Sequence, residues 1–339
     1  MPTSSTVILH FGPHKTGTTY IQKTLLNNRS ELMQAGVIYP DLFLEDPGHH
    51  ALPRALGQDT ATAVRDLRKF MADLNGETRR VIFSSENLSL LSHAEMVSLR
   101  DALAPQTILP IIYLRNRAQS IWSQYQEHVK FGEVKSFSDY VSYLLLLQPD
   151  ANAIDPLGLA LRVGRVFGSV DIVSYDGCVA EFRDLTDPIL VAACGASLAL
   201  PHRLGGRSNV RMAQERVEIL RLLNLVHLRR GKKPANFVRA AFLKGLRENS
   251  ELCAAEALAT VAIRQRLTEF PLAELEHFYS KIDAERLRDL SNIGIDVPAF
   301  RTDSVSERVV YSYLPDTAIL FSSIPQSIAS IYNLLELNS

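Results

Sequence analysis

The residues with the clearest chemical potential form a short run near the start of the chain, where glycines, a lysine and several hydroxyls come together. An apolar stretch at 7–11 precedes the run and predicts a buried strand. After the run, apolar residues recur at helical spacing from residue 20 onward, so a strand, a tight turn and a helix follow one another. Backbone N–H groups and a helix dipole then converge on one point, which favours binding of a phosphate or sulfate. This run, the lysine loop, consists of Gly12, Pro13, His14, Lys15, Thr16, Gly17, Thr18 and Thr19.

The lysine loop has the glycine spacing of a Walker A loop without its ending. A Walker A loop reads G-x-x-x-x-G-K-[ST], and Gly12 and Gly17 have this spacing. Thr18 and Thr19 stand where the lysine and the hydroxyl residue would be, and the lysine is Lys15, inside the loop. From there its ammonium can reach a bridging or leaving oxygen of a bound anion. The alternative interpretation is an ordinary strand–turn–helix corner with a solvated lysine.

A carboxylate is expected at the same edge of the sheet. The predicted strand 80–83 runs into two serines and Glu86, and a helix is predicted over 88–103. Because the carboxyl ends of parallel strands open on one edge, Glu86 is a candidate general base. Its alternative role is to stabilise the start of the helix. The segment 41–53 predicts a surface loop, in which His49 and His50 are expected to be solvated or to contact substrate.

A second anion site is predicted after the strand 108–114. Arg115 ends this strand, and Ser123 lies two turns into the helix predicted over 118–130. The two side chains are eight residues apart and can reach one anion beside the sheet edge. A helix-capping arginine and a buried serine are the alternative.

The two sites together resemble those of the sulfotransferases that use 3′-phosphoadenosine-5′-phosphosulfate (PAPS). In that family a lysine followed by Ser/Thr-Gly-Thr-Thr binds the 5′-phosphosulfate, as Lys15 and the four residues after it would here. The family also carries an arginine and a serine at the interval of Arg115 and Ser123, and both bind the 3′-phosphate. Two positions depart from the family pattern, since Arg117 replaces a common proline and the pair at 119–120 replaces Asp-Arg. Neither change removes an anion ligand.

The resemblance, which covers about the first 210 residues, implies transfer of a sulfuryl group from PAPS to an acceptor hydroxyl or amine. The product would be 3′-phosphoadenosine 5′-phosphate, and no metal is expected. Lys15 would stabilise the leaving oxygen and Glu86 would take the acceptor's proton. His14 and His50 are reserve bases, because some members of the family use a histidine. Many members fold a basic loop over the nucleotide, which makes Arg207 a candidate third ligand of the 3′-phosphate.

The strand pattern predicts the fold class. Short strands alternate with helices, which predicts a P-loop-like α/β fold with a doubly wound parallel sheet. We expect residues 1–210 to form the PAPS-binding core. Residues 211–339 are expected to be mostly helical and to serve acceptor binding or oligomerisation, and the role of the apolar segment 309–337 stays open. The predicted strands are 7–11, 37–39, 80–83, 108–114 and 170–175.

The composition of the chain limits the classes of binding partner that we expect. A formal net charge of −1 over 339 residues argues against an electrostatic nucleic-acid binder. No apolar run is long enough for a transmembrane segment, although a basic turn at 229–233 leaves peripheral contact with lipid head groups open. The three cysteines are widely spaced and are interpreted as reduced core thiols. With no secretory signal recognised, we expect a cytoplasmic location. By family analogy, the expected acceptor is a glycan or glycolipid.

Two alternatives to a sulfotransferase stay open. A P-loop kinase would need the Walker A lysine and hydroxyl residue after Gly17, where the chain has Thr18 and Thr19. A nucleotide-binding protein without transfer activity would need neither Lys15 nor Glu86, and their presence argues against it only weakly.

Overall fold

The chain forms two compact units whose segments alternate along the sequence. The computed structural model describes residues 5–74, 80–148, 151–202, 212–233, 236–270, 272–297, 312–316, 319 and 322–335. The first unit comprises Met1–Arg117, Asp150–Ser208 and Tyr279–Asp303, and the second comprises Ala118–Pro149, Asn209–Phe278 and Ser304–Ser339. The boundary that the sequence predicts near residue 210 stays a prediction. Helix α14 (Leu272–Asn292) contributes residues to both units, and its Leu290 is buried in the core of the first.

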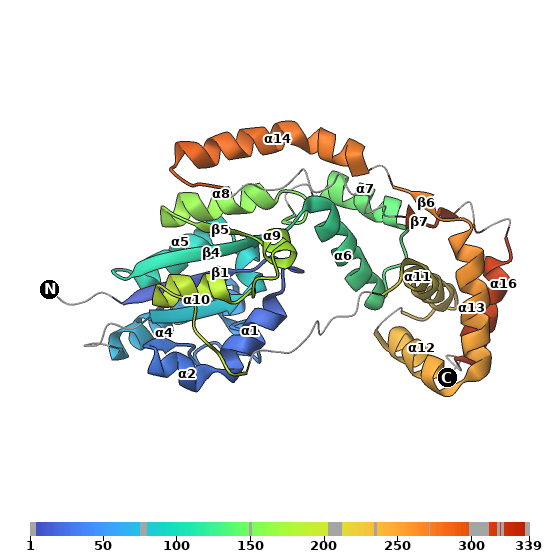
Figure 1. The fold of residues 1–339 in the computed structure, drawn as a ribbon, viewed down its shortest axis with the longest axis horizontal. Coiled ribbons are helices and arrows are strands. Elements are labelled where there is room, and N and C mark those ends of the chain that lie inside the picture. Colours follow the sequence, from blue (N-terminus) through green and yellow to red (C-terminus); the bar gives the residue numbers. More distant parts are fainter. Residues whose placement is uncertain are drawn as a thin grey trace. The chain divides into compact units, whose positions relative to one another are not determined.

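A parallel sheet organises the first unit. In the described part of the chain it has five strands in the order β2-β3-β1-β4-β5. Figure 1 labels β1, β4 and β5 in this sheet. All neighbouring strands are parallel. The predicted fold class and the predicted strands are therefore confirmed. The strands are β1 (Thr6–Phe11), β2 (Val37–Ile38), β3 (Arg80–Ser85), β4 (Thr107–Leu114) and β5 (Asp171–Ser174).

Helices cover both faces of this sheet. In β1, Val7, Leu9 and Phe11 pack on one face, while Ile8 packs on the other. Such strands are apolar on both sides because both faces are buried, as a parallel sheet requires. The first face is covered by α3 (Ala51–Gln58), α4 (Thr60–Asp73), α5 (His93–Leu103) and α8 (Pro156–Phe167). The second face is covered by α1 (Thr18–Asn27), α2 (Arg29–Gln34) and α10 (Asp187–Cys194).

The strand order makes the carboxyl ends of β1 and β4 the switch point of the sheet, where the connections from neighbouring strands diverge. From β1 the chain leads to β2, on the far side of β3, whereas from β4 it leads to β5 in the opposite direction. Ligands of open α/β sheets bind where the connections diverge in this way. The lysine loop follows β1 and Arg115 follows β4, so the fold brings both to this point.

The segment after β3 differs from the prediction. The helix predicted over 88–103 is divided into a 3₁₀ helix, η1 (Glu86–Leu90), and α5. A new start forms because Ser92 and Glu95 make a capping box, in which each side chain accepts a backbone N–H of the other residue. Glu86 is therefore the first residue of its own short helix, directly at the end of β3.

Helices dominate the described part of the second unit. Its core includes the aromatic side chains of Trp122, Tyr125 and Phe137, which contact one another. A short antiparallel pair, β6 (Thr268–Glu269) with β7 (Ser312–Tyr313), adds to the helices. The helices are α6 (Arg117–Lys130, whose first residue belongs to the first unit), α7 (Phe137–Leu147), α11 (Gln214–Arg229), α12 (Asn236–Glu248), α13 (Ser250–Arg264) and α16 (Ile324–Leu334).

Two further predictions can be compared with these elements. Cys178 is buried and Cys194 is partly buried, but Cys253 is exposed. The interpretation as core thiols is therefore wrong for Cys253, which is exposed on α13.

Among the described residues, none of the helices has the length and apolarity needed to cross a membrane. The remaining helix of the first unit, α9 (Tyr175–Ala180), follows β5.

Candidate functional site

The lysine loop presents the start of α1 to an anion. Gly17 precedes the helix with φ 79°, and Lys15 has φ 73°, so both adopt left-handed backbone conformations. No side chain caps α1, and its first turn contains no acidic residue. The first N–H groups of a helix have no intrahelical partner, and they carry the positive end of its dipole. This end of α1 therefore has the backbone chemistry of an anion site.

Close packing within the loop explains Gly12. A Cβ at Gly12 would lie 2.2 Å from Cγ2 of Thr18 and 2.8 Å from Nε2 of His10. Only a residue without a side chain fits there. The hydroxyl of Thr16 donates to the carbonyl of Pro13 at 2.7 Å, and its side chain is buried. Thr16 thus braces the loop from within, whereas Thr19 and His14 are exposed at its surface.

Arg115 connects the end of β4 to the lysine loop. Its Nη1 donates to the carbonyl oxygen of Lys15 at 3.0 Å. Its guanidinium lies 5.0 Å from the ring centroid of Tyr175, and its Nε lies 3.9 Å from Oδ1 of Asp176. Burial raises the pKa of the Asp176 carboxyl, against the opposing effects of the Asn116 N–H and of Arg115. Arg115 is therefore held at the end of β4 by its hydrogen bond to the lysine loop.

The contacts of Arg115 do not include Ser123 or Arg207, the two other predicted ligands of the 3′-phosphate. Ser123 lies on α6 in the second unit, whereas Arg115 belongs to the first. Arg207 lies outside the described residues. The joint role of these residues stays a prediction.

Glu86 and His50 lie next to each other at the end of β3. Oε2 of Glu86 accepts a hydrogen bond from Nε2 of Gln22 at 2.9 Å. The same oxygen lies 3.7 Å from Nδ1 of His50, which is 3.0 Å from Oγ of Ser85. The sequence predicts Glu86 as the base, with His14 and His50 in reserve, and did not indicate Gln22. Helical spacing could have found Gln22, because it stands four residues after Thr18 on the same face of α1.

His49 has a structural role that differs from the prediction. The segment 41–53 was expected to be a surface loop, but α3 begins at Ala51 and His49 is fully buried. Its Nδ1 accepts the N–H of Ser84 at 3.1 Å, and its Nε2 is 3.0 Å from the carbonyl of Pro40. Burial lowers its pKa to about 4. His49 is therefore a neutral residue of the core, and the expectation of a solvated side chain is wrong.

A second buried histidine lies behind the lysine loop and was missed by the sequence analysis. His10, on β1, is fully buried, and its Nδ1 is 2.7 Å from Oγ of Ser84. Its ring packs edge-on against Tyr113. Burial lowers its pKa to about 3, so this side chain is neutral at physiological pH. The sequence feature that could have indicated His10 is the presence of a histidine within an apolar strand.

Arg117, which departs from the family pattern, has a structural explanation. Its side chain is buried, and its guanidinium donates to the carbonyl of Ile154 at 2.7 Å and to Asp283 at 2.6 Å. It also stacks on Tyr279. Arg117 therefore holds the end of β4 to α14, away from anion binding.

Two of the cavities among the described residues, one in each unit, are candidates for holding a ligand. One, of about 480 Å³, begins at η1, the helix that starts with Glu86. Asn152 in its wall donates to Oγ of Ser89, and the Ser89 hydroxyl donates to the carbonyl of Glu86. Both polar and apolar side chains line this cavity. Its lining residues are Ser89, Leu90, Leu91, Ser92, His93, Ala151, Asn152, Asp155, Gly158, Leu161, Arg162, Arg165 and Arg286.

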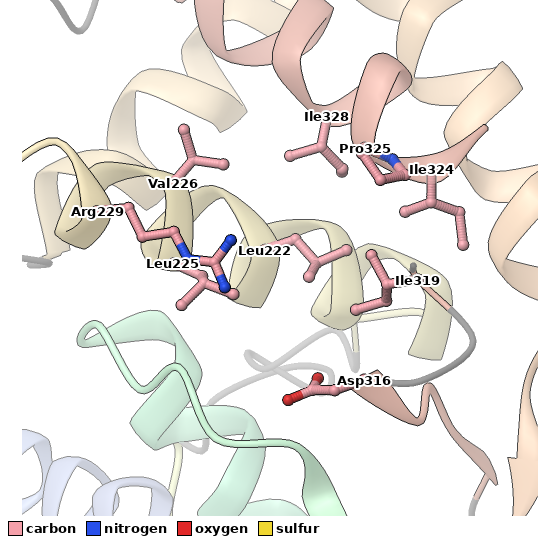
Figure 2. A pocket seen from close by; sticks show the side chains of 9 residues that line it. All are labelled: Leu222, Leu225, Val226, Arg229, Asp316, Ile319, Ile324, Pro325 and Ile328. Carbon is pink, nitrogen blue, oxygen red and sulfur yellow. The ribbon is translucent and has the colours of Figure 1, made fainter. Parts of the chain in front are cut away.

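The other cavity, of about 380 Å³, lies in the second unit between α11 and α16 (Figure 2). Arg229 and Asp316 are its charged lining residues among those described, and Asp316 is paired with Arg221 at 3.1 Å. This lining lacks the group of donors that a nucleotide with two phosphate ends needs. Its aliphatic residues are Leu222, Leu225, Val226, Ile319, Ile324, Pro325 and Ile328.

Comparisons with known proteins add little to this geometry. No protein-family description matches the chain, and no curated protein matches its sequence. Among solved structures, the chain is similar to a sulfotransferase from Alicyclobacillus acidocaldarius, with 16% sequence identity and a TM-score of 0.38. The match covers 70% of this chain and 99% of that one. The fold described above rests on the strand order and pairing of this chain itself.

Proposed function

We propose that this chain is a sulfotransferase that transfers a sulfuryl group from PAPS to an acceptor hydroxyl or amine. The observation that carries the proposal is the meeting of three groups at one sheet edge. The lysine loop follows β1, Glu86 and His50 lie at the end of β3, and Arg115 follows β4 and donates to the carbonyl of Lys15. An anion site, a basic group and a second cation are the parts that in-line sulfuryl transfer requires.

In this proposal, the lysine loop holds the 5′-phosphosulfate of PAPS. The N–H groups at the start of α1 bind its oxygens, and Lys15 stabilises the charge that develops on the bridging oxygen as it leaves. Arg115 binds the 3′-phosphate, with Ser123 and Arg207 as further ligands. The pair formed by Glu86 and His50 supplies the base that receives the acceptor's proton.

The acceptor in this proposal is rich in hydroxyl groups, such as a glycan or the head group of a glycolipid. The cavity that begins at η1 supports this choice, because serine, asparagine and arginine side chains are among the residues that line it. Arg162, which donates to Asn152 there, is the side chain to test. Arg162→Ala should raise the KM for the acceptor and leave binding of the nucleotide unchanged.

Calorimetric binding of nucleotides tests the proposal. The chain should bind 3′-phosphoadenosine 5′-phosphate at least about tenfold more tightly than ATP with Mg²⁺, a difference of about 1.4 kcal/mol. Transfer of labelled sulfate from PAPS to a panel of glycans and glycolipids then separates an enzyme from a binding protein. Equal or tighter binding of ATP would favour a kinase, and tight nucleotide binding without any transfer would favour an inactive binder.

A further inference from the structure

Groups from separate elements hold Glu86 and His50 side by side. Glu86 starts η1, His50 directly precedes α3, and Gln22 belongs to α1. The amide of Gln22 donates to the Glu86 oxygen that faces Nδ1 of His50. The side chains of Glu86 and His50 are about four-fifths buried, with 18% and 20% exposed, and Gln22 is 1% exposed. Both the carboxylate and the imidazole therefore have restricted orientations at a site that is still open to solvent.

Helix α1 connects this pair to the anion-binding loop. Gln22 stands one turn after Thr18, about 6 Å along the helix axis. The segment that carries His50 packs closely on it, because a Cβ at Gly48 would lie 2.7 Å from the Gln22 amide. One rigid helix thus positions both the anion site at its start and the Glu86–His50 pair beside its second turn.

The surroundings of Nδ1 determine the tautomer of the neutral His50 ring, that is, which of its two nitrogens carries the proton. A carboxylate can only accept hydrogen bonds, so a proton on Nδ1 is attracted by Glu86, whereas a lone pair there would be repelled. Oγ of Ser85, at 3.0 Å, can accept the same proton. The carboxylate of Glu86 therefore favours the neutral ring that is protonated at Nδ1, in which Nε2 carries the lone pair.

We infer that His50 and Glu86 act as one unit, in which Nε2 of His50 is the catalytic base and Glu86 is the positioning residue that holds the imidazole in the Nδ1–H form. The catalytic part of this inference rests on the proposed sulfotransferase function. It gives Glu86 and His50 different roles in one arrangement.

The transfer step can be written with all its bonds. The acceptor oxygen forms a bond to sulfur while its proton passes to Nε2 of His50. The bond between sulfur and the bridging oxygen breaks, and its electron pair stays on the 5′-phosphate of the product nucleotide, where Lys15 stabilises it. The imidazolium that forms is stabilised by Glu86 and loses its proton to water after the product leaves.

Nitrogen NMR of the histidine-labelled chain tests the arrangement without any substrate. Long-range ¹H–¹⁵N spectra, recorded at a pH where the histidines are neutral, distinguish the two tautomers. His49 is a reference in the same spectrum, because its Nδ1 accepts the Ser84 N–H and its proton must be on Nε2. Signals of His50 are assigned with His50→Gln. We expect His50 to show the Nδ1–H pattern, opposite to that of His49.

Variants of nearby carboxylates show which group controls the tautomer. Glu86→Gln should move a measurable share of His50 to the Nε2–H form, and Glu86→Asp should have an intermediate effect. Glu45→Gln is the matched control, because Glu45 lies in the same segment as His50 but pairs with Arg54. An Nε2–H pattern for His50 in the parent chain, or the same pattern in parent and Glu86→Gln, would overturn the inference.

Kinetics test the division of roles once transfer is measured. His50→Ala should lower turnover by about 10²–10⁴, and added imidazole should restore part of it. The double variant Glu86→Gln/His50→Ala should be no slower than His50→Ala alone, because both residues act through one base. Normal turnover in His50→Ala would assign the base to Glu86 and overturn the inference. A parent chain that transfers no sulfate would instead refute the proposed function.

Discussion

At the scale of single residues, Lys15 combines a proposed catalytic side chain with an uncommon backbone conformation. Its φ is 73°, a region that residues other than glycine rarely adopt. Its carbonyl accepts a hydrogen bond from Arg115, so neighbouring groups help to hold this conformation. The backbone contact does not depend on the lysine side chain, which can therefore be shortened without loss of the loop.

Lys15→Ala should lower turnover by about 10²-fold or more, because an electrostatic stabiliser of the leaving oxygen is removed. Alanine and lysine are similarly strained at this φ, so the thermal unfolding temperature should change little. Steady-state kinetics and a thermal scan measure the two effects. Turnover near that of the parent would exclude Lys15 from the catalytic role.

Arg115 has two expected roles, and ligand binding separates them. Arg115→Ala removes a proposed charge-assisted hydrogen bond to the 3′-phosphate, worth about 1.5–3 kcal/mol, and also the hydrogen bond to the Lys15 carbonyl. Binding of 3′-phosphoadenosine 5′-phosphate should therefore weaken more than binding of adenosine 5′-phosphate, as measured by calorimetry. Equal losses for the two ligands would mean that Arg115 only supports the loop.

At the scale of secondary-structure elements, β3 holds two buried histidines through one residue. Oγ of Ser84 is 2.7 Å from Nδ1 of His10, and the N–H of Ser84 donates to Nδ1 of His49. Burial lowers both pKa values, to about 3 and about 4. Protonation of either ring would place an uncompensated charge in the core beneath the site. The sheet that positions the site therefore depends on neutral histidines.

Stability should fall as the pH decreases from about 6.5 toward 4. In this range the unfolded chain, with ordinary histidine pKa values near 6.5, binds more protons than the folded chain, so the free energy of unfolding falls as the pH falls. Each of the two histidines should contribute a slope of about 1.4 kcal/mol per pH unit. Urea unfolding at several pH values measures this slope.

The variant His49→Gln should be less stable at neutral pH but should have a slope smaller by about 1.4 kcal/mol per pH unit. His93→Gln is the control, because His93 is exposed at the start of α5. A slope that does not change in His49→Gln would contradict the burial of a neutral His49.

At the scale of the whole molecule, the chain builds a second core that the motifs do not reveal. The side chains of Arg221 and Glu218 are fully buried and form an ion pair at 2.7 Å. Arg221 also donates to the carbonyls of Val134 and Leu314. Tyr125 donates to Glu218 from the aromatic group of the second unit. The sole tryptophan, Trp122, is buried in the same unit, so its fluorescence reports on this core.

Arg221→Met should destabilise the second unit by about 3–5 kcal/mol, because it leaves the Glu218 carboxylate buried without its cation. The double variant Glu218→Leu/Arg221→Met should recover most of this loss, since it removes the charge that Arg221→Met leaves unpaired. Urea unfolding followed by Trp122 fluorescence measures both changes. A double variant as unstable as Arg221→Met would show that the other contacts of Arg221 carry the stability.

The sequence by itself determined the elements of the sheet and the type of chemistry at its edge. Short apolar runs between helical segments are local signals, so the five described strands of the parallel sheet could be predicted from them. The lysine loop, Glu86 and Arg115 could be placed at strand ends for the same reason. The position of the break between η1 and α5 was missed, because it depends on the capping box that Ser92 and Glu95 form at the start of α5 and not on apolar spacing.

The tertiary structure alone decided which of these residues meet and what each can do. The adjacent histidines at 49 and 50 are alike in the sequence, yet one is buried as a core residue and the other faces Glu86. Gln22 is an ordinary helical residue until β3 and the segment before α3 pack against it. Contacts between residues far apart in the sequence leave no local pattern, because they are set by the packing of whole elements.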